Sequence, residues 1–252
     1  MLKINFKKIL FLLFSCIFLN TAAQAAISMP SINIGLTNAN TPQEFSQGIQ
    51  VLITLTILTL TPSIIIMTTS FIRIVIVLSL TRQAIGTATL PPNQVIVGLA
   101  LILTFFVMSP TLSKINETAY QPYMKNVITQ QKALDNAIVP IREFMFKQTH
   151  EPELALFIKL AKLPKMKTQS EVPTYVLIPS FVLSELKTAF KIGFIIFLPF
   201  LVIDLVVASV LVSMGMMFLP PTTIAMPFKL IMFVMVDGWT LITQSLIEGF
   251  VQ

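Results

Sequence analysis

The chain has 252 residues, of which 55% are hydrophobic and only 11% are charged. Soluble domains are typically about 25% charged, so this composition indicates a membrane protein. The formal charge of +6 is scattered and forms no basic stripe with interleaved aromatic residues, which argues against a nucleic-acid partner.

Residues 1–25 have the three parts of a secretory signal peptide: a basic start, an apolar run over 9–19, and small residues at Ala23 and Ala25. We therefore expect cleavage after Ala25. The alternative is an uncleaved first transmembrane helix, but a hydrocarbon core needs about 20 apolar residues and this run is shorter. The only cysteine, Cys16, lies in this leader, so we expect a mature chain without disulfides or cysteine metal sites.

The next two segments are a tail and a helical hairpin. Residues 26–44 are rich in Asn, Thr, Pro and Ser, which favours an exposed tail. Residues 45–110 contain apolar stretches over 49–80 and 94–108, separated by a connector with a Pro91-Pro92 pair. This pattern predicts a first apolar hairpin whose first arm kinks at Pro62.

The composition then changes, because residues 111–172 contain nine Lys and Arg and six Asp and Glu. This segment is expected to be a water-facing helical insertion, with helices over 123–137 and 141–148 and a third from Glu151 to near Pro164. An exported N-terminus followed by two spans places this insertion in the periplasm. The positive-inside rule opposes this only mildly, since it weakens for loops near 60 residues.

Apolar character returns over 173–252, interrupted by Pro220-Pro221. This predicts a second helical hairpin with its turn at the proline pair. The fold class predicted from the whole pattern is an all-α membrane protein, with two long hairpins that flank the periplasmic insertion and assemble as a ring-like helical oligomer.

Eight charged residues lie inside the apolar regions, where each needs a partner or water. They are Arg73, Glu185, Lys187, Lys191, Asp204, Lys229, Asp237 and Glu248. Counting outward from Pro220-Pro221 places Lys191 near Glu248 and Asp204 level with Asp237. Two acids at one depth cannot neutralise each other, which predicts that a second chain or water meets them, unless these segments are not embedded in lipid.

No catalytic motif is found in the sequence: it contains no nucleophile elbow, phosphate-binding loop or zinc-protease motif. The single histidine, His150, is interpreted as a solvated surface residue. We therefore expect neither an enzyme nor a cofactor or metal.

Six of the thirteen methionines fall within residues 214–235, around the Pro220-Pro221 turn. Methionine is unbranched and adaptable, so it fills irregular cores as readily as it forms deformable surfaces. Spacing alone leaves both interpretations open.

Several segments resemble the FliP family of the type III export gate. They include 185–190 (Glu-Leu-Lys-Thr-Ala-Phe), 203–205 (Ile-Asp-Leu), 214–217 (Met-Gly-Met-Met), 227–229 (Pro-Phe-Lys) and 237–239 (Asp-Gly-Trp), with further matches over 69–73 and 104–110. The resemblance covers the chain from about Phe45 to its end.

The resemblance implies a pentamer that joins FliQ-like and FliR-like membrane subunits in the flagellar basal body of the bacterial inner membrane. Unfolded flagellar proteins are the implied cargo, and the gate stands largely above the bilayer plane. Met216, Met217 and Phe218 match a pore-lining run of methionines, from which Phe218 departs. A virulence-type export gate is the alternative function; a small-solute channel and an intramembrane enzyme are further hypotheses.

Subunit contacts are expected from the insertion and from the charged helix that follows it. Phe144 and Phe157 lie on short helices of an insertion that can bury few aromatics by itself. Glu185 cannot face Lys187 at a spacing of two on a helix, so a neighbouring chain is its expected partner.

Overall fold

The computed structural model describes residues 42–251, apart from positions 88, 165–167 and 217. Over these residues the chain forms helices and turns without a strand, which confirms the all-helical class. The chain divides into two compact units, Met1–Thr56 and Ile57–Gln252, and the packing below is that within the second unit. The expected leader over 1–25 and most of the expected tail lie outside the described residues, so both stay predictions.

The first apolar region is interrupted after Pro62, and the kink expected at Pro62 itself stays a prediction. Helix α2 (Pro42–Met67) continues through Pro62, and the interruption falls at 68–70, before α3 (Phe71–Ile85) begins. At this interruption the Thr68 hydroxyl donates to two main-chain carbonyls of the preceding turn, at 3.0 and 3.3 Å. Threonine side chains that bond backward in this way compete with the helix hydrogen bonds and favour a bend or an end.

A short connector joins α3 to α4 (Asn93–Ile115), and α3 ends at the left-handed Gly86. The Arg82 guanidinium fixes the connector by donating to the Pro91 carbonyl at 3.0 Å and to Asn93 Oδ1 at 2.7 Å. The proline-rich connector expected from the sequence is therefore tied to the end of the helix before it.

The insertion contains, in chain order, the π-helix η2 (Asn116–Tyr120), α5 (Gln121–Met124), α6 (Gln130–Gln148), α7 (Glu151–Leu160) and the 3₁₀ turn η3 (Gln169–Glu171). The division of α6 into two helices was wrong, because the helix continues through Pro140. Its start is fixed by Thr129, whose hydroxyl accepts a bond from the Lys132 main-chain N–H at 3.4 Å.

The last region consists of α8 (Thr174–Ser213), α9 (Pro221–Met235) and α10 (Gly238–Val251). Helix α8 continues through two prolines, Pro179 and Pro199. Helices α9 and α10 are bent by 62° relative to each other, at a two-residue break. The region after the proline pair is thus two helices rather than one straight arm.

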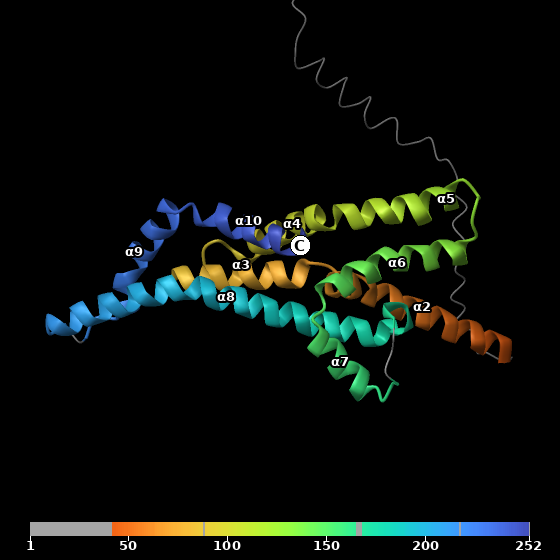
Figure 1. Ribbon diagram of the computed structural model, residues 1–252, viewed down its shortest axis with the longest axis horizontal. Helices are drawn as coiled ribbons and strands as arrows, with labels where there is room; N and C mark the ends of the chain where they lie inside the picture. The colour runs from red at the N-terminus through yellow and green to blue at the C-terminus, as the bar shows by residue number, and fades with distance from the viewer. Residues whose placement is uncertain (1–41, 88, 165–167, 217, 252) are drawn as a thin grey trace, which may run out of the picture. The chain divides into compact units, whose positions relative to one another are not determined.

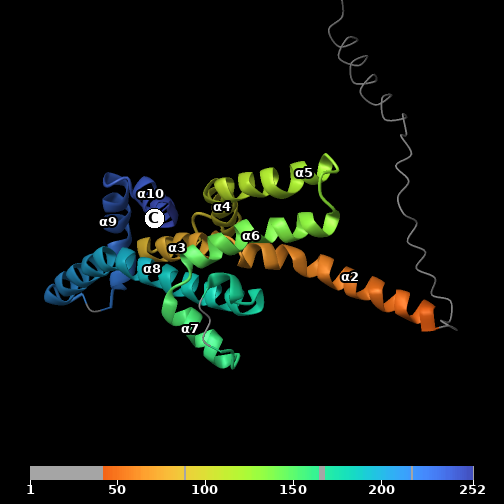
Figure 2. The same cartoon turned by 45° about the vertical axis from the view of Figure 1, so that its right-hand side comes forward.

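Helices α3 and α8 lie side by side and form the centre of the second unit (Figures 1 and 2). The residues at this contact include Ile74, Val77 and Leu78 from α3 and Leu177 and Phe181 from α8, all fully buried. Where these helices lie in lipid, which is as apolar as the side chains, close packing rather than removal from water stabilises the contact. Helix α7 packs against the first half of α8 and α9 against its second half (Figure 1).

Within residues 42–251, three of the described helical segments are long and apolar enough to cross a membrane: Ile49–Met67, Asn93–Met124 and Thr174–Ser213. The bent pair Pro221–Met235 and Gly238–Phe250 adds a fourth if it counts as one span. In the first segment none of the residues is buried inside the molecule. A large apolar helical surface left open in this way fits contact with lipid or with other membrane chains.

Candidate functional site

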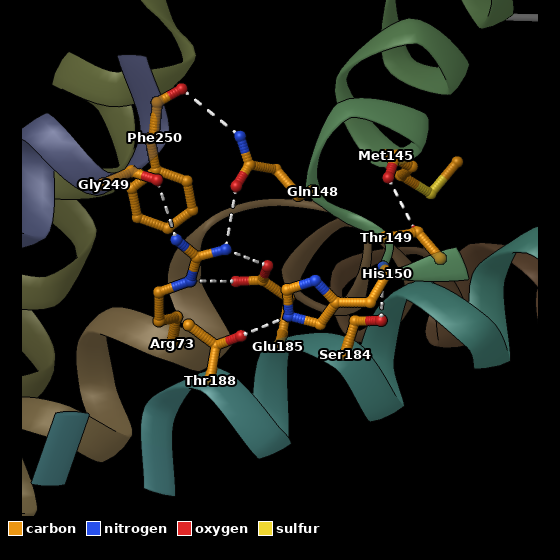
Figure 3. Close-up of polar contacts among 10 residues, drawn as sticks. All are labelled: Arg73, Met145, Gln148, Thr149, His150, Ser184, Glu185, Thr188, Gly249 and Phe250. Atoms are coloured by element: carbon orange, nitrogen blue, oxygen red, sulfur yellow. Dashed lines mark hydrogen bonds and ion pairs between the residues drawn. The ribbon is translucent and has the colours of Figure 1, made fainter. Parts of the chain in front are cut away.

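A buried ion pair joins the two central helices. Arg73 of α3 is 4% exposed and Glu185 of α8 is fully buried. Arg73 Nε donates to Glu185 Oε2 at 2.8 Å, and Nη2 donates to Oε1 (Figure 3). Both charges thus find their partner within the chain, and the expectation that Glu185 needs a neighbouring chain as its partner was wrong.

The same guanidinium also holds the end of α10 and a side chain of α6. Nη1 of Arg73 donates to the Gly249 carbonyl at 3.2 Å, and Nη2 donates to Gln148 Oε1 at 2.9 Å. Gln148 in turn donates to the Phe250 carbonyl at 3.3 Å, and the Phe250 ring centroid lies 3.9 Å from Arg73 Cζ (Figure 3). We call this group of residues the Arg73 cluster; it consists of Arg73, Gln148, Glu185, Gly249 and Phe250.

The Arg73 cluster provides hydrogen-bond partners for the buried Arg73 guanidinium, whose burial without partners would be unfavourable. Arginine carries five N–H donors in a planar fork, and a helix leaves its last carbonyls without partners. A positive group near those carbonyls also interacts favourably with the helix dipole. The cluster therefore connects α3, α6, α8 and α10 through one cation. Gln148 was missed by the sequence analysis, since a neutral residue in an amphipathic helix gives no signal.

A second polar contact attaches α7 to α8. Lys187 Nζ donates to Glu153 Oε1 at 2.7 Å, and this hydrogen bond holds the pKa of Glu153 below its ordinary value of 4.5. His150 precedes α7, and its Nε2 forms a hydrogen bond of 3.0 Å with the Thr188 hydroxyl (Figure 3). The His150 main-chain N–H donates to Ser184 Oγ at 3.0 Å. His150 is exposed, as expected, but it contributes to this junction.

A third pair lies between α8 and α9, where Lys229 Nζ donates to Asp204 Oδ2 at 2.6 Å and to the Ala84 carbonyl at 3.3 Å. The expected register, with Asp204 level with Asp237, was wrong. The reason is the loop before Pro220, which places the centre of the turn ahead of the proline pair. Opposite charges therefore face each other where two acids were expected.

Four of the eight charges in the apolar regions are exposed on this chain: Lys187, Lys191, Asp237 and Glu248. Lys191 does not meet Glu248, which instead accepts a bond from Gln244 of its own helix at 2.7 Å. The 62° bend before α10 changes the direction of the chain. Residues at equal distances in sequence from Pro220-Pro221 therefore do not lie side by side beyond α9. The inference that the monomer contains unbalanced buried charge was therefore wrong.

The two aromatic residues expected at subunit contacts lie differently. Phe144 is buried within the chain, with ring centroids 5.9 Å from Phe181 and 6.3 Å from Phe250. Phe157 is half-buried against the core. The insertion thus buries Phe144 against α8 and α10, which the sequence analysis did not foresee. A role of either residue in assembly stays a prediction.

The loop between α8 and α9 contains the residues expected to line a pore. Helix α8 closes with bonds from Gly215 N to the Val212 carbonyl at 3.0 Å and from Met216 N to the Leu211 carbonyl at 2.9 Å. Gly215 has a φ of 75°, which favours glycine, and the two bonds form a Schellman motif. Glycine therefore ends the helix here and turns the chain into the loop.

The loop presents apolar side chains outward. Met214 is 63% exposed, Met216 is 44% exposed and Phe218 is fully exposed. Met217 lies outside the described residues. The interpretation of these methionines as ordinary core filling does not fit Met214 and Met216 within this chain, because core residues are buried. Exposed apolar residues at a helix tip point to contact with other molecules.

Among the described residues, no group of three or more His, Cys, Asp and Glu side chains is placed to hold a metal ion. The long apolar helices, with Arg73 paired to Glu185 and Lys229 paired to Asp204 inside the chain, define a helical membrane protein. The sequence model of the FliP family matches residues 54–246, and the chain belongs to this family.

Similar proteins from three bacteria share the same name. The flagellar biosynthetic protein FliP of Pectobacterium carotovorum subsp. carotovorum is 54% identical, over 84% of this chain and 82% of that protein. The protein of the same name from Bacillus subtilis (strain 168) is 50% identical, over 86% of this chain and 98% of its own length. The Caulobacter vibrioides protein of that name is 49% identical, over 91% of this chain and 85% of that protein.

Proposed function

We propose that this chain is the pore-forming subunit of the flagellar type III protein export gate and conducts unfolded flagellar subunits across the bacterial inner membrane. Membership of the FliP family and the flagellar names of relatives about 50% identical support the flagellar role. The candidate spans support the membrane location. The relatives' names also favour this function over its alternative, a virulence-type export gate.

The observation that carries the pore-forming role is the exposed apolar loop between α8 and α9. A conduit for unfolded chains must pass side chains of many shapes and still hold back ions when idle. Methionine suits this task because its side chain is unbranched and has three rotatable bonds. Met216 and Phe218 are exposed at the loop, where several copies can meet around an axis.

The working unit in this proposal is a homopentamer with FliQ-like and FliR-like membrane subunits. Apolar side chains that α8 leaves open, such as Phe194 at 65% and Leu205 at 67% exposure, offer surface for such neighbours or for lipid. The insertion over 111–172 faces the periplasm in this arrangement. Five copies surround the pathway, so each loop contributes one segment of a ring.

A crosslinking experiment tests the proposal. A photoreactive phenylalanine analogue replaces Phe218, and cells produce an exported flagellar protein fused to a domain that cannot unfold, so that the cargo stalls. The proposal predicts a light-dependent adduct between residue 218 and the cargo. The matched control places the analogue at Leu134 of α6, which is also exposed at 54%. Equal labelling from both positions, or labelling from Leu134 alone, would contradict a pore-lining loop.

A further inference from the structure

Two adjoining hollows lie between α4 and α10. The first has a volume of about 500 Å³ and is bounded also by α6 through Phe144. The second has a volume of about 620 Å³ and reaches Trp239. Both are lined by Phe106 and Ile247, so they form one depression, called the α4–α10 groove below. Each volume falls in the range of about 300–1,000 Å³ typical of small-ligand sites.

The groove has apolar walls and a different charge at each end. Lys114, Glu143 and Lys147 line the first hollow, and Glu248 lines the second. Lys114 Nζ bonds Glu143 Oε2 at 3.1 Å, whereas Lys147 has no ion pair or side-chain hydrogen bond within the described residues. The first end therefore has an excess of one positive charge, and the second end has a negative charge.

This charge pattern selects the class of ligand. A small soluble anion would leave the apolar walls in contact with water, and an uncharged apolar molecule would make no use of the positive charge of the exposed Lys147. An amphiphile with an anionic head and an apolar tail satisfies both. Lys114 and Phe106 also belong to the candidate span Asn93–Met124, so the groove opens on a helix long enough to lie in lipid.

We propose that the α4–α10 groove binds one anionic phospholipid, with the phosphate at Lys114 and Lys147 and an acyl chain against Phe106 and Ile247. Basic pockets between membrane helices bind acidic head groups in this manner. Glu248 at the far end disfavours the reverse orientation. The bound lipid bridges α4, α6 and α10 beside the Arg73 cluster, since Gln148 and Phe250 line the same hollow.

The single tryptophan provides the test, because Trp239 lines the groove and no other residue of the chain contributes tryptophan fluorescence. The full chain is placed in nanodiscs of phosphatidylcholine with increasing fractions of phosphatidylglycerol brominated on its acyl chains. In the matched series the brominated lipid is phosphatidylcholine. The proposal predicts that half-maximal quenching needs a smaller fraction of brominated phosphatidylglycerol than of brominated phosphatidylcholine. Each lysine that contacts the phosphate should lower the required fraction roughly fivefold.

Two double variants assign the preference to the groove. K114Q/K147Q should abolish the difference between the two lipids, whereas K132Q/K159Q, which removes the same charge at exposed sites outside the groove, should leave it unchanged. Equal quenching by both lipids in the unmodified chain, or the same preference in both variants, would overturn the proposal. Weak quenching by both lipids would show that acyl chains do not enter the groove and would overturn the proposal as well. If K114Q/K147Q does not fold, high salt applied to the unmodified chain should remove the preference instead.

Discussion

Arg73 shows why an arginine stands at the centre of this fold. Its guanidinium donates two parallel hydrogen bonds from one edge to the Glu185 carboxylate and also donates to the Gly249 carbonyl and to Gln148. A lysine is a point charge on a flexible stem and cannot match this planar set. The residue thus links a core ion pair to the end of the chain.

The first prediction concerns this buried pair. Replacing Glu185 by Gln keeps the shape of the side chain but leaves the Arg73 charge without a counter-charge. We expect the free energy of unfolding to fall by about 3–5 kcal/mol, as for other buried pairs that lose one partner. Denaturant unfolding of the detergent-solubilised chain, followed by circular dichroism, measures the change.

The control is the exposed pair of Lys114 and Glu143, whose side chains are 61% and 54% exposed. Glu143→Gln should change the unfolding free energy by less than about 1 kcal/mol. The double variant R73M/E185L should recover much of the lost stability, since apolar replacement of a buried pair is often neutral. Equal effects of Glu185→Gln and Glu143→Gln would show that the Arg73 cluster contributes no special stability.

The second prediction concerns acid and the junction of α7 with α8. The pKa of Glu153 is lowered in the folded state by the bond from Lys187, so the unfolded chain binds this proton more readily. The stability from this pair should be fully present above the ordinary pKa of 4.5 and should disappear as the pH falls through the lowered pKa. Thermal unfolding of the natural chain and Glu153→Gln across this pH window measures the difference. A difference in Tm that persists at the lowest pH would contradict it.

The sequence identified which charges matter more readily than how they pair. Arg73 and Glu185 stand out because charges in apolar segments are rare and need partners. Their pairing depends on how α3 and α8 pack, which no local pattern contains. The outward count failed for Asp204 because it ignored the loop before Pro220, and Gln148 gave no signal because it is neutral.

At the level of single helices, local signals located the starts of two helices. The acidic residues and proline at 151–153 predicted the start of α7, and the proline pair at 220–221 predicted the start of α9. The proline inside α6 was one source of error, since this helix continues through Pro140. Tertiary packing decides whether a helix tolerates an internal proline, and the sequence alone does not reveal it.

The third prediction compares two helical glycines. A methyl group on Gly193 of α8 would overlap the Leu80 side chain of α3, whereas Gly98 of α4 has open space around it. Gly193→Ala should therefore destabilise the chain by about 1–3 kcal/mol through overpacking. Gly98→Ala should be neutral or stabilise it by up to about 1 kcal/mol, because alanine favours helix. The same denaturant titration measures both, and equal shifts would contradict close contact between α3 and α8 at Gly193.

At the scale of the whole molecule, the charges embedded most deeply are satisfied within one chain. Arg73 with Glu185 and Lys229 with Asp204 need no second copy. The case for an oligomer therefore rests on the exposed apolar helices, on the loop between α8 and α9, and on what the FliP family implies. Hydropathy located the long apolar helices, but it does not separate the surfaces that contact lipid from those that contact other subunits.

In the function proposed above, the loop at Met216 and Met217 seals a conduit. The most direct measurement is small-ion conductance across membranes that contain the assembled complex, recorded together with the mass of that complex, for the natural chain and for M216A/M217A. A sealing role of these methionines predicts a complex of unchanged mass that leaks ions, because alanine leaves a gap that methionine fills. A destabilised or smaller complex without a leak would contradict it, since truncation of a fully buried core methionine instead costs about 2–5 kcal/mol per residue.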